Sequence, residues 1–105
     1  MLYDHRTYTC KPGTIRKHLD LYVQLGYAAQ TRHLGQPVFY AITDVGDVNQ
    51  YVHVWAYEDA ADRARKRAAM QADPAWQEYL RVSGEAGWLL SQENKILLPA
   101  PSLAK

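Results

Sequence analysis

NQYVHVWAYEDAADR, residues 49–63, joins a strand-like run to the start of a helix. From Tyr51 to Tyr57, aromatic and β-branched side chains dominate, a composition typical of a β-strand. Asp59 then stands where a side-chain oxygen can accept hydrogen bonds from the first free amides of a helix. The stretch therefore predicts a strand followed at once by a helix, and the other elements can be placed on either side of it.

Three further segments have strand composition: residues 2–10, 38–45 and about 91–98. After Thr14, apolar residues recur at helical spacing until Gly35 and Pro37, and Gly26 is a place where this helix could break. The helix that begins at Asp59 restarts at Asp73-Pro74, because aspartate suits the cap and proline suits the first helical position. Alanines 61, 64, 68 and 72 predict a narrow stripe of small residues that packs on the sheet.

The resulting order is β-α-β-β-α-β, in the α+β class. Short connections and right-handed crossovers favour a four-stranded antiparallel sheet with spatial order 4-1-3-2 and the helices on one face. This is a ferredoxin-like plait. At 105 residues the chain is expected to form a single domain over 1–105.

Composition limits the possible functions. The formal charge is +1, so no overall field favours nucleic acid or an anionic membrane. The lone Cys10 excludes an intrachain disulfide and is interpreted as a small strand-end filler rather than a reactive thiol. With neither a leader-like start nor a long apolar run, a cytoplasmic location is expected.

Alternation along residues 51–57 assigns two faces. Val52, Val54 and Ala56 form an aliphatic face that is expected to contact the helices. The other face then carries the aromatic set and would be open to water. The set is Tyr51, His53, Trp55 and Tyr57. A second copy of the chain is the simplest cover, which predicts a homodimer through the sheet faces.

Charged residues on the first strand could reach the same space. One parity of this strand carries Leu2, Asp4, Arg6 and Tyr8, and the strand lies beside residues 51–57 in a 4-1-3-2 order. Because a buried charge is costly unless it is paired, Asp4 and Arg6 should bond each other or another polar group. They could form a structural ion pair or orient a ligand.

His53 is the best catalytic candidate, because imidazole titrates near neutrality and can act as a general base or hydrogen-bond a ligand. The alternative is a buried histidine that is hydrogen-bonded only within the protein. The other histidines form no compact cluster, so no metal is expected. Arg63, Lys66 and Arg67 are the one basic cluster; spacing from Asp59 and Asp62 favours a solvated helix face with ion pairs over a nucleic-acid surface.

Three stretches resemble the NIPSNAP family, and together they span nearly the whole chain: LYDHRTYTCKPG, DVGDVNQYVHVWAYEDAADRARKRAAMQADPAW and SQENKILLPAP. The resemblance implies a dimeric α+β barrel of ferredoxin-like subunits. It also implies barrel-lining positions at Asp4, Arg6, His53, Trp55 and the polar run Gln92-Glu93-Asn94. Asp4 stands where the family has glutamate, and His5 where an aliphatic residue is more usual. The family implies no settled reaction.

Two main hypotheses follow. In the first, the dimer encloses an aromatic cavity that binds a small apolar or aromatic molecule without a cofactor. Its ligand-binding residues would be Asp4, Arg6, Tyr8, Tyr51, His53, Trp55, Tyr57 and Asn94. In the second, the aromatic side chains leave no cavity and the protein is an interaction or scaffold module. A cofactor-independent monooxygenase-like enzyme is a further alternative.

Overall fold

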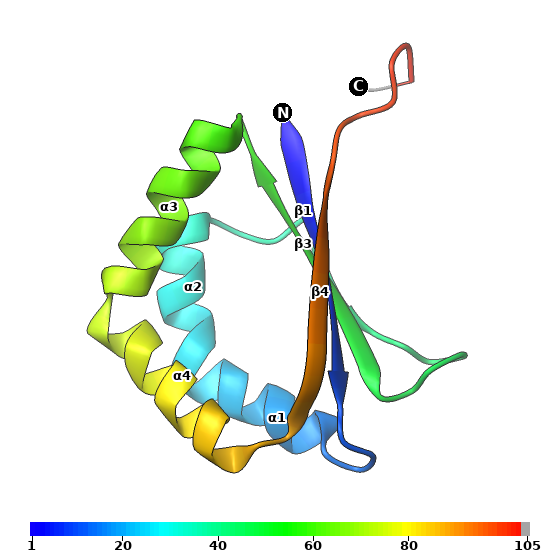
Figure 1. The fold of residues 1–105 in the computed structure, drawn as a ribbon, viewed down its shortest axis with the longest axis vertical. Helices are drawn as coiled ribbons and strands as arrows, with labels where there is room; N and C mark the ends of the chain where they lie inside the picture. Colours follow the sequence, from blue (N-terminus) through cyan, green and yellow to red (C-terminus); the bar gives the residue numbers. More distant parts are fainter. Residues whose placement is uncertain (104–105) are drawn as a thin grey trace.

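The computed structural model describes residues 1–103 and has the ferredoxin-like plait (Figure 1). Its elements follow in chain order: β1 Leu2–Cys10, α1 Ile15–Leu21, η1 Tyr22–Gly26, α2 Tyr27–Leu34, β2 Phe39–Ile42, β3 Gln50–Tyr57, α3 Ala60–Ala72, α4 Pro74–Ala86 and β4 Leu89–Leu97. The predicted element order is confirmed. The main difference is β2, which ends at Ile42 rather than at residue 45.

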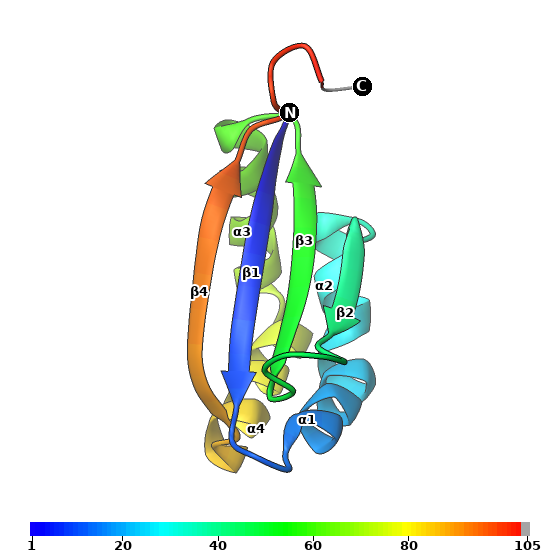
Figure 2. The same cartoon turned by 90° about the vertical axis from the view of Figure 1, so that its right-hand side faces the viewer.

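The four strands form one antiparallel sheet in the order β2-β3-β1-β4, the predicted 4-1-3-2 order counted from the other edge. Figure 2 shows the strands side by side with the helices behind them. The register places Asp4 opposite Trp55 and Arg6 opposite His53. Directly paired residues share a sheet face, so the charged parity of β1 and the aromatic parity of β3 lie together.

Aspartates define the helix starts after β3. The Asp59 side chain accepts from the Asp62 amide at 2.7 Å, and Asp73 accepts from the Ala75 amide at 2.9 Å. Pro74 occupies the first turn of α4. Both caps agree with the sequence prediction, because each carboxylate satisfies an amide that has no partner within the helix.

Helices α1 and α2 are joined by a π-helical turn, η1, instead of being separated by a break. Gly26 ends this turn and touches α4: an added Cβ would lie 3.0 Å from ring carbons of both Tyr22 and Tyr79. A glycine is needed here because it lets α4 approach closely. Such π-turns concentrate at functional sites, and both tyrosines line the cavity described below.

The predicted assignment of sheet faces is wrong. Tyr51, His53, Trp55 and Tyr57 are at most 2% exposed and lie beneath the chain's own helices, while Val52 and Ala56 are on the outer face. Trp55 and Tyr57 share a core cluster with helix residues Met70, Trp76 and Tyr79. The large strand rings and the large helix side chains together fill the space between the two layers.

The predicted faces of α3 are also wrong. The alanines at 61, 64, 68 and 72 are exposed, whereas the basic residues are not all on a solvated surface. Arg63 reaches the sheet and bonds buried Asp4 at 3.0 Å. Asp62 and Lys66 do form the expected pair at 3.1 Å. A helix that carries three arginines among its 13 residues can pack basic side chains on a sheet only where that sheet supplies polar partners.

The outer sheet face carries Tyr3, His5 and Thr7 on β1, and Val52, Val54 and Ala56 on β3. Phe39 lies next to Val54 in the register and is 45% exposed. Within residues 1–103 no helix covers this face (Figure 2).

Candidate functional site

Two neighbouring cavities lie between the sheet and the helices. The first has a volume of about 90 Å³ and the second about 130 Å³. They adjoin, because five residues line both: Tyr8, Gln30, Trp76, Leu80 and Gln92. The cavities therefore belong to one subunit rather than to a space between two sheets, which corrects the predicted position.

Aromatic rings form the walls of the first cavity. The Tyr40 ring stacks on His53 with a centroid distance of 4.6 Å and on Tyr51 at 5.8 Å. Tyr22 stacks on Tyr40 from the helix side at 5.2 Å. Tyr8 lies across from His53 at 4.9 Å. A flat aromatic guest would find ring faces on several sides here.

The hydrogen bonds of His53 define its tautomer. The indole Nε1–H of Trp55 donates to Nδ1 of His53 at 2.6 Å. Because the indole nitrogen can only donate, Nδ1 must be the acceptor and the imidazole proton must be on Nε2. Nε2 is buried and has no partner among the described residues. His53, which lines the first cavity, thus offers one unused N–H donor.

Burial and positive charge keep His53 neutral. Burial lowers the pKa of His53 to about 3, and the nearby guanidinium of Arg6 adds to this effect. Asp4 opposes the shift and Arg67 adds to it. At neutral pH the imidazole is therefore a neutral hydrogen-bond donor, which suits ligand binding better than general-base chemistry at Nε2.

Four further groups on the walls of the first cavity are also neutral at pH 7: His18, Tyr40, Tyr51 and Tyr79. His18 bonds the Tyr51 hydroxyl at 2.7 Å, and burial lowers the pKa of this histidine. Burial raises the pKa of Tyr51 and Tyr40, and it raises that of Tyr79 to about 12. These tyrosines keep their protons at neutral pH, so their hydroxyls can orient a ligand but do not supply a ready phenolate.

Asp4 organises the charged end of the site. This fully buried carboxylate accepts from Arg6 at 3.1 Å, from Arg63 at 3.0 Å and from the Asn94 amide at 3.0 Å. Burial alone would raise the pKa of Asp4, but the Asn94 hydrogen bond and the two guanidinium charges outweigh it and lower the pKa. Asp4 therefore stays ionised and fixes the position of Arg6.

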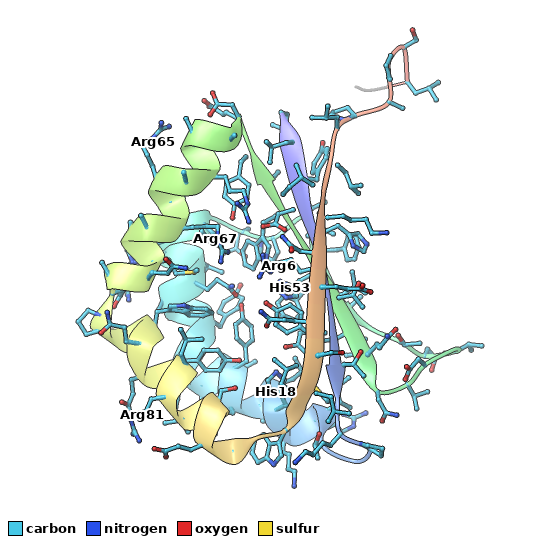
Figure 3. The ribbon with its side chains drawn as sticks, in the orientation of Figure 1. Arg6, His18, His53, Arg65, Arg67 and Arg81 are labelled. Carbon is cyan, nitrogen blue, oxygen red and sulfur yellow. The ribbon has the colours of Figure 1, made fainter. Side chains whose placement is uncertain are left out.

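Arg67 is the third guanidinium group, after Arg6 and Arg63, in the layer between the sheet and the helices. It lines the second cavity together with Arg6, and Figure 3 shows it reaching from α3 toward the sheet face where Arg6 and His53 lie. Among residues 1–103 no carboxylate lies within 4.0 Å of Arg67, the limit for an ion pair. Its charge is thus available to a ligand.

The eight predicted site residues share the inner sheet face, but only some reach the cavities. Arg6, Tyr8, Tyr51 and His53 do so. Asp4 accepts a hydrogen bond from Arg6 and another from Asn94, so these two residues hold Arg6 in place. Trp55 orients His53 through its indole hydrogen bond. Glu93 pairs with Thr7 and lies on the outer face, so it does not join the site as the resemblance implied.

Sequence reasoning missed the residues that the helices and β2 contribute. These are Tyr22, Gln30, Tyr40, Arg67, Trp76 and Tyr79. One signal was present for α3: Arg63, Arg67 and Met70 recur at helical spacing on one face. Tyr40 on a short edge strand gave no comparable signal.

The described residues give no sign of a metal site or a membrane span. Across residues 1–103, no three His, Cys, Asp or Glu side chains come together as metal ligands. No helix in that range is both long and apolar enough to span a bilayer. Cys10 is fully buried, and burial raises the pKa of its thiol, which agrees with a filler role.

Comparisons with known proteins identify relatives over the whole fold. A protein from Agrobacterium tumefaciens is 37% identical with a TM-score of 0.88, and the match covers 98% of this chain and 97% of that one. An uncharacterized NIPSNAP-like domain protein from Burkholderia xenovorans is 40% identical with a TM-score of 0.87, over 96% and 86% of the two chains. An antibiotic biosynthesis monooxygenase is 20% identical with a TM-score of 0.64 over 96% of this chain and 100% of that chain, a likeness of fold alone.

Curated sequences give the same result. The Protein NipSnap homolog of Dictyostelium discoideum is 30% identical over 98 residues, which cover 93% of this chain and 42% of the relative. This chain thus spans about two fifths of the length of the curated relatives it matches. The NIPSNAP family model matches residues 3–103. The chain belongs to the NIPSNAP family.

Proposed function

We propose that this protein binds a small aromatic molecule in the cavities between its sheet and its helices. The observation that carries the proposal is the unused Nε2–H of His53, a buried donor in the wall of an aromatic cavity. A buried donor without a partner costs about 1–3 kcal/mol. A ligand or ordered water that accepts this hydrogen bond would remove that cost.

The size of the space restricts the ligand. An apolar cavity of roughly 150 Å³ is enough for benzene. The first cavity alone is smaller than this at about 90 Å³, but the adjoining one adds about 130 Å³. A molecule with one ring and a short polar substituent fits both cavities together, while a fused multi-ring compound would require the helices to move.

The proposed assembly is a homodimer through the outer sheet face. The aromatic face cannot be the interface, because the chain's own helices cover it. The outer face supports the proposal better, because Phe39 is exposed there and Val52 and Ala56 are partly exposed, with no helix over them among residues 1–103. Packing it against a second copy would remove this apolar area from water.

The experiment for ligand binding is a thermal-shift screen of the purified protein with one-ring phenols and quinols. Compounds that bind should raise the melting temperature of the wild type in proportion to their concentration. His53→Phe keeps a ring but removes the donor, so it should weaken the shift. His5→Phe makes the same change on the opposite sheet face and should leave it intact. If no compound of the panel raises the melting temperature, the scaffold hypothesis is favoured.

A further inference from the structure

We propose that the ligand of this site is an aromatic carboxylate, whose ring spans the two adjoining cavities and whose acid group bonds Arg67, Arg6 and the Nε2–H of His53. This inference rests on the proposed function and names the chemical class of its ligand.

The balance of charge in the layer between sheet and helices favours an anionic ligand. Arg6, Arg63 and Arg67 all reach this layer, and Asp4 is the carboxylate that pairs with Arg6 and Arg63. Both Asp4 oxygens are already in use: Oδ2 accepts from Arg6 and Arg63, and Oδ1 from Asn94. Arg67 therefore keeps an unneutralised charge in a partly desolvated position, where charge-assisted hydrogen bonds are strongest.

The polar groups around this charge are mainly donors. The Gln30 Oε1 atom already accepts from the Tyr22 hydroxyl, so its NH₂ group remains free to donate. His53 offers Nε2–H, and Arg6 has guanidinium protons beyond those it gives to Asp4 and Tyr8. The side-chain amides of Gln71 and Gln92 supply both a donor and an acceptor. The surplus is therefore of donors, which favours a ligand group made of acceptors, and a carboxylate is such a group.

The charges of Arg6 and Arg67 also affect the pKa of neighbouring side chains. Besides burial, Arg6 and Arg67 both help to lower the pKa of His53. Burial raises the pKa of Tyr57, and the charge of Arg67 opposes that rise. Arg67 thus acts on His53 and Tyr57 at once, in agreement with a side chain that reaches from α3 toward the inner sheet face (Figure 3).

The arrangement of the two cavities orients the guest. Stacked rings of Tyr40, Tyr51 and His53 line the first one, and Arg6 and Arg67 line only the second. A single-ring acid can place its ring among aromatic faces and its carboxylate at the guanidinium groups. Anions without a ring would leave the aromatic cavity unfilled.

The test compares two probes of nearly equal shape, 4-hydroxybenzoate and 4-hydroxybenzamide, by calorimetric titration of the full chain at pH 7. The acid should bind the wild type at least ten times more tightly than the amide. Arg67→Gln should weaken acid binding by roughly ten- to a hundredfold and change amide binding little. Arg65→Gln alters an exposed arginine of the same helix and should change neither. Arg67 is chosen because it has no ion-pair partner among residues 1–103 to lose, so the variant should fold.

Each result separates the hypotheses. Equal binding of acid and amide, or full acid binding by Arg67→Gln, would overturn this inference while the proposed function stands. Binding of neither probe would overturn both. Inorganic phosphate is the anion without a ring; if it binds as tightly as 4-hydroxybenzoate, the ring has no role and the assignment of an aromatic acid is wrong.

Discussion

Trp55 donates its indole proton to Nδ1 of His53, with the two nitrogens 2.6 Å apart. The two residues are on the same face of β3, and their rings meet edge to face at 5.9 Å. This bond fixes which nitrogen of His53 carries the proton, and it directs the protonated nitrogen away from Trp55. A tryptophan that does not line the cavity thereby determines the chemistry of a histidine that does.

The first prediction concerns the protonation of His53. Because burial and Arg6 lower its pKa to about 3, nitrogen-15 chemical shifts should show the neutral Nε2–H tautomer, unchanged between pH 8 and pH 5. A titration of His53 with a midpoint near the ordinary value of 6.5 would contradict the structure. In the Trp55→Phe variant Nδ1 of His53 loses its hydrogen-bond donor, so the shifts should show a mixture of the Nδ1–H and Nε2–H tautomers.

The second prediction concerns stability in acid. The folded pKa of His53 is below its ordinary value of 6.5, so between pH 6.5 and 3 the unfolded chain binds the extra proton. The contribution of neutral His53 to the unfolding free energy is therefore complete above pH 6.5. It is lost as the pH falls, by at most about 1.4 kcal/mol per pH unit. His53→Gln should flatten the pH dependence of the unfolding free energy over this range, measured by urea denaturation. An unchanged slope would show that other groups cause it.

The third prediction concerns the buried carboxylate. Asp4→Ala leaves Arg6 and Arg63 without their shared acceptor, which should cost about 3 kcal/mol of unfolding free energy, at the low end for a broken buried pair because Arg63 is partly exposed. Glu93→Gln, on the outer face of β4, is the control and should change stability by less than about 0.5 kcal/mol. Equal effects in chemical denaturation would mean that Asp4 does not organise the charged layer.

The fourth prediction compares two helical glycines. Gly26→Ala inserts a methyl group 3.0 Å from ring carbons of Tyr22 and Tyr79, and overpacking of this kind costs about 1–3 kcal/mol. Gly84 lies inside α4 with nothing within 4 Å of an added Cβ. Gly84→Ala should therefore raise the unfolding free energy by about 0.5–1 kcal/mol. Thermal unfolding followed by circular dichroism measures both, and a stabilised Gly26→Ala would be inconsistent with the close helix contact.

The fifth prediction concerns the proposed dimer. Phe39→Asp puts a charge on the outer sheet face, so it should convert a dimer to a monomer in sedimentation velocity. Val45 is 92% exposed in the loop after β2, and Val45→Asp should leave the dimer intact. A monomeric wild type at micromolar concentration would rule out the assembly.

Several site residues could be found from the sequence because strand geometry is regular. Alternation put Asp4 with Arg6 on one parity of β1 and His53 with Trp55 on one parity of β3. The register shows that these two parities share a face. The residues from α3 and β2 could not be found in the same way. Tyr40 joins the site because β2 pairs with β3 in a register that places it opposite His53. Arg67 joins it through the packing of α3 on the sheet, which depends on contacts throughout the core.

Local signals in the sequence determined the element order, the caps at Asp59 and Asp73, and the spatial order of the strands, because capping, alternation and short connections act over a few residues at a time. Only the tertiary structure decided which side of the sheet the helices cover. Alternation separates two faces but does not say which one is buried. Here Met70, Trp76 and Tyr79 pack against the aromatic face, and the bonds from Arg63 and Asn94 to Asp4 make burial of charge possible there.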